Sequence, residues 1–330
     1  MSPPSLPARI LESLRVDGAS WRRLAAFGSV HAPEWFKRAS PPLIAALLFV
    51  GVADRRRAAI ANFERVLGAD RRTARRAALR MYSQFAYCLS EAMEHYSSRP
   101  APLRIDRAEP NAVELALREG RGVVLVTGHL GSWDIGAKAL LDVGTTVHVV
   151  MARESNATSR SFVRATREQV GVRVVYSDAS TFSSLGLIAA LRRNEVVAIQ
   201  LDRAAGAGGL RMLPFLGAPA PFPSGPFGLA RLARSPVVPV FVPRVGRRHS
   251  EIRFGERIDV PREARDPEIL DRVMGDAVRQ LEDAVRRDPT QWFQFAPFWV
   301  EPEPRRRFER PRDGRDVLHS PAIPRDEQSA

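Results

Sequence analysis

The sequence predicts an α/β fold, with a central, mostly parallel sheet covered by helices on both faces and an N-terminal helical, membrane-associating segment. Three observations support this prediction. Short β-branched runs alternate with helical patterns between about residues 103 and 300. These runs are apolar at nearly every position, which is typical of strands that are buried on both faces. The chain has 330 residues, of which 45% are hydrophobic, and this suffices for one large domain with its own core.

Residues 1–100 predict a helical segment. The stretch "RRRAAIANFERVLG" (55–68) carries apolar residues at helical spacing and ends at Gly68, which is typical of a helix C-terminus. The stretch "TARRAALRMYSQFAYCLSEAMEHY" (73–96) predicts a long amphipathic helix. Cys88 lies on the apolar positions of this helix. It is the single cysteine of the chain, so an internal disulfide is excluded and core packing is expected.

The longest apolar run is "LIAALLFVGVA" (43–53), which follows two prolines and precedes "DRRR". It is shorter than the roughly 20 residues that a membrane-spanning helix needs. Two interpretations stay open: a buried helix, or an element that dips into the membrane next to flanking cations. Trp21, Trp35 and Phe36 lie nearby, and aromatic residues of this kind are enriched at membrane interfaces.

Residues 101–300 predict the α/β domain. The predicted strands are 122–127, 145–150, 172–177, 196–202 and 236–244. The helical patterns between them are 133–142, 157–169, 183–193 and 224–234. The stretch "EIRFGERIDV" (251–260) alternates more strongly and predicts an antiparallel strand at an edge of the sheet. A helix is predicted at 266–288, with Asp266 as its N-cap and Pro267 in its first turn. Residues 301–330 are charged, rich in proline and without period, which predicts a disordered tail.

The net charge of +13 at pH 7 favours partners that carry phosphate groups, such as an anionic membrane surface or a coenzyme A or carrier-protein thioester. No reading helix or interleaved aromatic pattern accompanies the arginines, so we expect no nucleic-acid partner. No metal site is expected either, because the histidines outside the turn described next do not cluster with acidic residues at ligand spacing. These histidines are His31, His95, His148, His249 and His319.

The turn "GHLGS" after the first predicted strand carries the candidate chemistry. Ligands of α/β sheets bind where strands end and helices begin, and His129 lies at that point between glycines. Asp134 falls in the first turn of the next helix, where a carboxylate is favoured by the helix dipole. A carboxylate on one imidazole nitrogen raises the basicity of the other, which can then take a proton from an alcohol. By itself this spacing is a weak motif, and a structural histidine fits it as well.

A second candidate is the start of the helix 224–234. The backbone amides after Ser224 and Gly225 are expected to hold a phosphate group or a developing oxyanion, or merely to begin the helix. Phe215, Phe222 and Phe227 either line an apolar groove for an acyl chain or pack in the core.

The stretch "GHLGSWD" (128–134) resembles the signature block of the lysophospholipid acyltransferase superfamily. More narrowly, it is similar to the bacterial branch of lipid A late acyltransferases and phosphatidylinositol mannoside acyltransferases. Further matching blocks follow in order: "RRRAAIANFERVLG" upstream, residues 201–244 downstream, and "PTQWF" (289–293) near the end. The resemblance covers roughly residues 50–300.

This resemblance implies that His129 is the general base and Asp134 its partner. Lipid A acyltransferases usually carry glutamate at the second position, so Asp134 departs from that pattern and leaves the acceptor lipid open. Arg167 matches an arginine that the branch uses near the acyl donor or the acceptor head. The remaining expected substrate-binding residues are Arg153, Asn156, Asp202, Arg203, Ser224 and Gly225.

The expected function is therefore transfer of a fatty acyl group from an acyl carrier protein or coenzyme A thioester to a hydroxyl of a membrane lipid, such as a lipid A precursor. No cofactor beyond this co-substrate is expected, and no covalent acyl-enzyme. The alternatives are a lysophospholipid, phosphatidylinositol mannoside or specialised-lipid acyltransferase, and a non-catalytic lipid-binding relative. The expected location is the cytoplasmic face of the bacterial inner membrane, with peripheral or monotopic attachment.

Overall fold

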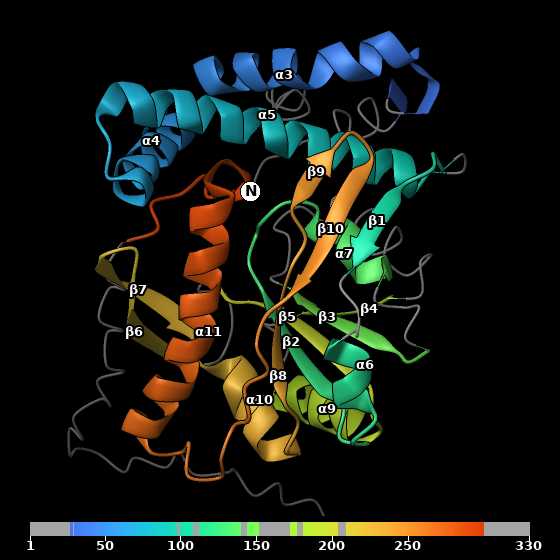
Figure 1. Cartoon of the computed structure of the whole chain (residues 1–330), viewed down its shortest axis with the longest axis vertical. Coiled ribbons are helices and arrows are strands. Elements are labelled where there is room, and N and C mark those ends of the chain that lie inside the picture. The colour runs from blue at the N-terminus through green and yellow to red at the C-terminus, as the bar shows by residue number, and fades with distance from the viewer. Residues whose placement is uncertain are drawn as a thin grey trace, which may run out of the picture. The chain divides into compact units, whose positions relative to one another are not determined.

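The computed structural model describes residues 27–28, 30–97, 100–107, 112–139, 144–151, 172–176, 181–203 and 209–299. Its centre is an eight-stranded sheet (Figure 1). Seven strands have the order β1-β10-β8-β2-β5-β3-β4, and the eighth, β9, pairs with β10. The strands of this sheet are β1 (Arg104–Arg107), β2 (Val123–Thr127), β3 (Val147–Met151), β4 (Val172–Tyr176), β5 (Val196–Gln200), β8 (Val237–Phe241), β9 (Arg244–Gly246) and β10 (His249–Phe254).

The predicted fold class is confirmed. The pairs β2–β5, β2–β8, β3–β5 and β3–β4 are all parallel. Alternate residues of β2 belong to two different hydrophobic clusters, because Val124 and Val126 pack on one face and Val123 and Leu125 on the other. Helices contribute to both clusters. They include α6 (Ala112–Leu117) on the second face, and α9 (Thr181–Arg192), α10 (Gly225–Ala233) and α11 (Pro267–Arg287) on the first.

The predicted edge strand is antiparallel but is not at the edge. β10 pairs antiparallel with β8, as its alternating sequence indicated. On its other side, β10 pairs in parallel with β1, a short strand that the sequence analysis did not predict. Two further strands were also missed. β6 (Leu210–Phe215) and β7 (Ala218–Pro223) form a separate hairpin in the proline-rich stretch before α10.

The two helix ends predicted at Gly68 and Asp266 are confirmed. α4 (Ala53–Leu67) ends at Gly68, which adopts the left-handed conformation with φ of 56°. α11 begins after Asp266, whose side chain accepts hydrogen bonds from the first free backbone amides of the helix, and Pro267 occupies its first position. α7 (Trp133–Ala139) starts directly after the predicted turn.

The N-terminal helices form a layer over the sheet domain, in which α3 (Glu34–Gly51) and α4 both pack on α5 (Arg71–His95) (Figure 1). The apolar run 43–53 has one buried side and one exposed side. Ala45 and Phe49 are buried against the layer, whereas Leu43, Leu47 and Val50 are 64%, 73% and 70% exposed. Among the described helices, none is by itself long and apolar enough to cross a membrane. α3 and α4 meet the length and composition criteria only as a pair, and that pair is bent by 100°.

Ion pairs attach α3 to the rest of the molecule. The Glu94 carboxylate, which is nearly buried, accepts hydrogen bonds from Lys37 of α3 at 2.8 Å and from Arg248 of the β9–β10 turn at 2.6 and 2.8 Å. Burial alone would raise the pKa of Glu94, but these two cations hold it below its usual range. One turn earlier on α5, Glu91 pairs with Arg244 at 2.9 Å. The layer is therefore joined to β9 and β10 by charge as well as by apolar packing.

Several predictions lie outside the described residues. They are the helix 157–169, the tail 301–330, Trp21, and the candidate substrate-binding residues Arg153, Asn156 and Arg167. The division of the chain at residue 100 also stays a prediction.

Candidate functional site

His129 and Asp202 meet because of the register between two parallel strands. The last residue pair of β2 and β5 is Thr127 with Gln200. The ladder continues one step further, because the Leu201 N–H donates to the Thr127 carbonyl at 2.8 Å. His129 and Asp202 each lie two positions beyond that last pair. Since side chains two positions apart in a strand share a face, the register brings both to the same place at the carboxyl edge of the sheet.

The two residues form a buried pair with two hydrogen bonds. The His129 Nδ1 lies 2.7 Å from Asp202 Oδ1, and the His129 backbone N–H donates to Asp202 Oδ2, also at 2.7 Å. Their side chains are 7% and 0% exposed. The edge of the Trp133 ring lies against the imidazole, with 5.4 Å between ring centroids. The ring of His129 is therefore fixed in position and orientation.

A C-terminal segment completes the environment of Asp202. The indole Nε1–H of Trp292 donates to Asp202 Oδ2 at 2.9 Å, and the Gln294 amide donates to the same oxygen at 3.0 Å. Gln294 also donates to the Asp202 backbone carbonyl at 3.1 Å. Both residues follow η2 (Pro289–Gln291), in and next to the "PTQWF" block. Burial alone would raise the pKa of Asp202, but the charge and hydrogen bonds of His129 hold it below its usual range.

This ionisation state determines the tautomer of His129. An ionised carboxylate only accepts hydrogen bonds, so Nδ1 carries a proton, and in the neutral imidazole Nε2 has the lone pair. Among the described residues, none makes a hydrogen bond to Nε2. The arrangement consists of a fixed imidazole, a carboxylate on one nitrogen and a basic second nitrogen, and it is suited to general-base catalysis.

The loop after His129 is held by the same C-terminal segment. The Phe293 N–H donates to the His129 carbonyl at 2.8 Å, and the Gly131 N–H donates to the Gln291 carbonyl at 2.9 Å. The Ser132 N–H donates to the Val242 carbonyl at 2.7 Å. These bonds tie the loop to the residues after α11 and after β8.

Glycine is required twice in this loop. Gly131 has a φ of +62°, and a Cβ there would lie 2.2 Å from the Val242 carbonyl oxygen. A Cβ at Gly128 would lie 2.8 Å from Leu281 of α11 and 3.2 Å from the Asp202 carboxylate. The glycines on both sides of His129 therefore let the chain approach β8, α11 and Asp202 closely.

Asp134 occupies the first turn of α7, as predicted, and is half-buried. Its backbone carbonyl accepts a hydrogen bond from the Tyr96 hydroxyl at 2.5 Å. A carboxylate that orients a histidine binds its Nδ1 atom. In His129 that atom is hydrogen-bonded to Asp202. Asp202, which the family resemblance predicts to bind substrate, is thus the carboxylate in direct contact with His129. The role of Asp134 stays a prediction.

The other predicted residues lie at different places. Arg203 directly follows Asp202, and its charge adds to the lowering of the pKa of that carboxyl. Ser224 precedes α10, and both its backbone N–H and its hydroxyl donate to the Gly209 carbonyl, at 3.0 and 2.8 Å. The three phenylalanines are fully buried in the larger hydrophobic cluster, so their place is the core; they are Phe215, Phe222 and Phe227.

A small cavity adjoins the loop between α5 and the start of α7. Its walls are mainly apolar and include Phe85, Cys88 and Leu89 of α5, and Ile135 of α7. Burial raises the pKa of the Cys88 thiol to about 12. Cys88 is therefore a neutral packing residue, as predicted, and not a nucleophile.

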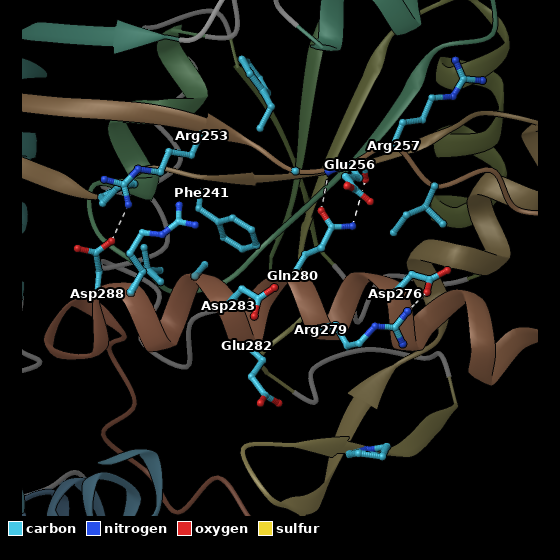
Figure 2. Close-up of a pocket in the computed structure, with 18 of the residues that line it drawn as sticks. Phe241, Arg253, Glu256, Arg257, Asp276, Arg279, Gln280, Glu282, Asp283 and Asp288 are labelled. Carbon is cyan, nitrogen blue, oxygen red and sulfur yellow. Dashed lines mark hydrogen bonds and ion pairs between the residues drawn. The ribbon is translucent and has the colours of Figure 1, made fainter.

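A larger cleft lies elsewhere, between the end of β10 and α11, and has a volume of about 830 Å³ (Figure 2). Arginines and acidic residues line it, and several pair with each other across it or along α11. Arg253 binds Asp288 at 2.7 Å, and Arg279 pairs with Asp276. Leu130 reaches this cleft, whereas His129 and Asp202 do not line it. The His129–Asp202 pair therefore lies outside this cleft. Among the residues that the structure describes, no three histidine, cysteine or acidic side chains gather as a metal site would require.

The fold and the site together define a class: an α/β protein with a buried histidine–carboxylate pair at the carboxyl edge of its parallel strands. The family follows from comparison. Residues 21–301 match the model of the bacterial lipid A biosynthesis acyltransferase family, and the chain belongs to that family. It is accordingly an acyltransferase of the lipid A type. A comparison with curated proteins found no match.

Proposed function

We propose that this protein transfers a fatty acyl group from an acyl carrier protein or coenzyme A thioester to a hydroxyl of a membrane glycolipid such as a lipid A precursor. His129 acts as the general base, and no covalent acyl-enzyme forms. The single observation that carries the mechanism is the buried His129–Asp202 pair, which leaves Nε2 of His129 with a lone pair. Family membership supports the reaction class.

In the proposed reaction, Nε2 of His129 takes the proton of the acceptor hydroxyl as that oxygen attacks the thioester carbon. The carbonyl oxygen becomes an oxyanion, the carbon–sulfur bond then breaks, and the imidazolium gives its proton to the departing thiolate. The products are the acyl ester and the free thiol. Throughout the cycle, Asp202 stays ionised and balances the imidazolium charge.

The oxyanion needs hydrogen-bond donors, and the nearest loop amides are already used. The N–H groups of Gly131 and Ser132 donate to the carbonyls of Gln291 and Val242. The predicted donors therefore remain the backbone amides after Ser224 at the start of α10. The apolar cavity beside the loop has a volume of about 20 Å³, which holds about one water molecule, so an acyl chain needs more room than this cavity offers.

The membrane surface is proposed to lie along α3. Phe36, Leu43, Leu47 and Val50 are exposed and spaced by about one or two helical turns, so they form one outer apolar stripe. An exposed stripe of this kind on a helix is typical of insertion into the interfacial region of a bilayer. Residues 53–80, in α4 and the first part of α5, contain nine arginines against three acidic residues. This charge favours an anionic bilayer, and we propose attachment to the cytoplasmic face of the bacterial inner membrane.

The activity is tested with purified protein, an acyl-carrier or coenzyme A thioester, and bacterial lipid extract analysed by mass spectrometry. We expect one lipid class to gain an acyl chain, and the same class to accumulate unacylated in a deletion strain. This observation also separates lipid A precursors from lysophospholipids, phosphatidylinositol mannosides and specialised lipids. If the thioester is not consumed with any lipid acceptor, the protein is a non-catalytic lipid-binding relative and the proposal is wrong.

Membrane attachment is tested by flotation with vesicles that contain anionic lipid. Leu47→Glu places a charge in the apolar stripe and is expected to reduce the bound fraction several-fold, because a charge is costly to bury in the bilayer interface. The matched control is Leu232→Glu, at a leucine of α10 that is 51% exposed and lies outside the stripe. Equal flotation of both variants would contradict the assignment to α3.

A further inference from the structure

The two oxygens of the Asp202 carboxylate have different partners. Oδ1 faces Nδ1 of His129 at 2.7 Å. Oδ2 accepts three N–H groups: the His129 backbone at 2.7 Å, the Trp292 indole at 2.9 Å and the Gln294 amide at 3.0 Å. One oxygen therefore serves the imidazole, and the other is held by the surrounding protein.

The three donors on Oδ2 are all electrically neutral. Among the described residues, no arginine or lysine makes a hydrogen bond to Asp202. Neutral donors stabilise the carboxylate charge without cancelling it, so the negative charge still acts on His129. They also withdraw electron density from the carboxylate, and a less basic carboxylate stabilises an imidazolium less strongly.

Trp292 and Gln294 are also rigid. The Trp292 ring contacts Phe298 and Phe215, with 4.9 and 5.6 Å between ring centroids. Gln294 donates to both the side chain and the backbone carbonyl of Asp202, and its own side chain is buried. The two donors are thus held in place by aromatic packing and by hydrogen bonds.

We propose that Trp292 and Gln294 are positioning residues that set the proton affinity of His129 through Oδ2 of Asp202. Without their hydrogen bonds, the carboxylate becomes more basic and Nδ1–H···Oδ1 favours the imidazolium, so the pKa of His129 rises. With them, Nε2 keeps its lone pair at a lower pH, as a general base requires. This inference rests on the proposed role of His129 as the base.

Other charged groups surround the pair and stay in place in the variants discussed below. Arg203 follows Asp202, and Asp134 lies on α7. From α5 and β9, Glu91 and Arg244 face the loop as an ion pair near Cys88. On the side of α11, the contact with the loop is through the apolar Leu281. Because none of these groups changes, a shift in the variants reports the loss of the donors on Oδ2.

The test measures the imidazole pKa of His129 directly by NMR of histidine-labelled protein, with the resonance assigned by its loss in His129→Gln. We expect Trp292→Phe and Gln294→Met each to raise that pKa by about one unit. Gln294→Met preserves size while removing the amide donor, whereas Trp292→Phe removes the indole N–H with a smaller ring, and circular dichroism shows whether each variant is folded. If Trp292→Phe does not fold, Gln294→Met carries the test alone.

Two controls are available nearby. Trp299→Phe removes an indole N–H that donates to the Phe215 carbonyl at 3.2 Å, within the same aromatic cluster. Gln291→Met removes an amide that binds the Arg244 backbone and not Asp202. Both controls are expected to leave the pKa of His129 unchanged. An unchanged pKa in both test variants, or an equal rise in the controls, would overturn the inference.

Kinetics separate this inference from the proposed function. The acidic limb of the pH profile of kcat/KM is expected to move up with the imidazole pKa in Trp292→Phe and Gln294→Met, while KM for the thioester changes little. A shifted NMR pKa in a protein without acyltransferase activity would support the role of the two donors and refute the proposed reaction. Acyltransferase activity with an unshifted pKa would support the proposed reaction and refute the role of the two donors.

Discussion

Strand β5 has a histidine–carboxylate pair at each of its ends, and the two pairs differ in how their carboxylates are held. At the carboxyl end, Asp202 faces His129 at 2.7 Å. At the amino end, Glu195 faces His148 of β3 at 2.6 Å. Both pairs are largely buried, and by distance alone they are equivalent.

The partners of the carboxylates distinguish them. Glu195 also receives two hydrogen bonds from the Arg193 guanidinium, at 2.8 and 3.1 Å, and this cation is the main reason that the pKa of Glu195 is lowered. The charge of Glu195 is therefore already balanced without His148. Asp202 has neutral donors instead, so its charge remains for His129. Distance alone therefore does not distinguish the two pairs, whereas the second partner of each carboxylate does.

The largest expected effect concerns the two histidines. His129→Ala removes the base and is expected to lower kcat/KM for acyl transfer by about 10²–10⁴-fold, the usual contribution of a general base. His148→Ala is expected to keep kcat/KM within a few-fold of the original value and to lower the thermal midpoint, because a buried hydrogen bond is lost. Comparable losses of activity in both folded variants would show that the two pairs do not differ as proposed.

The carboxylates provide the second test, which also decides the role of Asp134. Asp202→Asn places an amide against Nδ1 and disfavours the required tautomer, so a loss of about 10²-fold or more is expected. Glu195→Gln is expected to have little effect on turnover. Asp134→Asn should be milder than Asp202→Asn if Asp202 orients His129. A loss as large as that of Asp202→Asn would return the orienting role to Asp134.

The smallest effect is expected in acid stability. The pKa of Asp202 is lower in the folded protein than in the unfolded chain, so its contribution to stability is present above about pH 4 and is lost as the pH falls through the folded value. The free energy of unfolding, measured by urea titration, should therefore decrease less steeply below pH 4 in Asp202→Asn. Glu195→Gln should change this slope in the same direction but less, because solvent reaches Glu195. A steeper slope in Asp202→Asn would contradict the lowered pKa.

Much of the fold could be predicted because its determinants are local. The mostly apolar, β-branched runs predicted the parallel strands, and Gly68 and Asp266 predicted the ends of α4 and α11. The weaker elements escaped prediction. β1 has only four residues, and β6 and β7 contain prolines that argue against a strand. These strands form through tertiary pairing rather than through their own propensity.

The site could be predicted only in part, for the same reason. His129 was identified from the glycine turn, which is a local feature. Its contact with Asp202 depends on β2 and β5 being neighbours, and the sequence order does not reveal this because β3 and β4 lie between them in the chain. The available indication was that both residues directly follow apolar runs, whose ends meet at one edge in a parallel sheet. Trp292 and Gln294 lie about 90 residues beyond Asp202, and no local pattern indicates that they bind it.

The ion pairs around Glu94 have a consequence for how the enzyme meets its lipid. Lys37 comes from α3 and Arg248 from the β9–β10 turn, and both end on the same nearly buried carboxylate. A helix that is joined in this way cannot tilt without moving β9 and β10 with it, so it behaves as part of a rigid body and not as a flexible tether. The ions of a physiological buffer screen exposed charges beyond about 8 Å and weaken enclosed pairs far less. With α3 on the bilayer as proposed, the angle between the carboxyl edge of the sheet and the plane of the bilayer is expected to stay constant across ionic strengths.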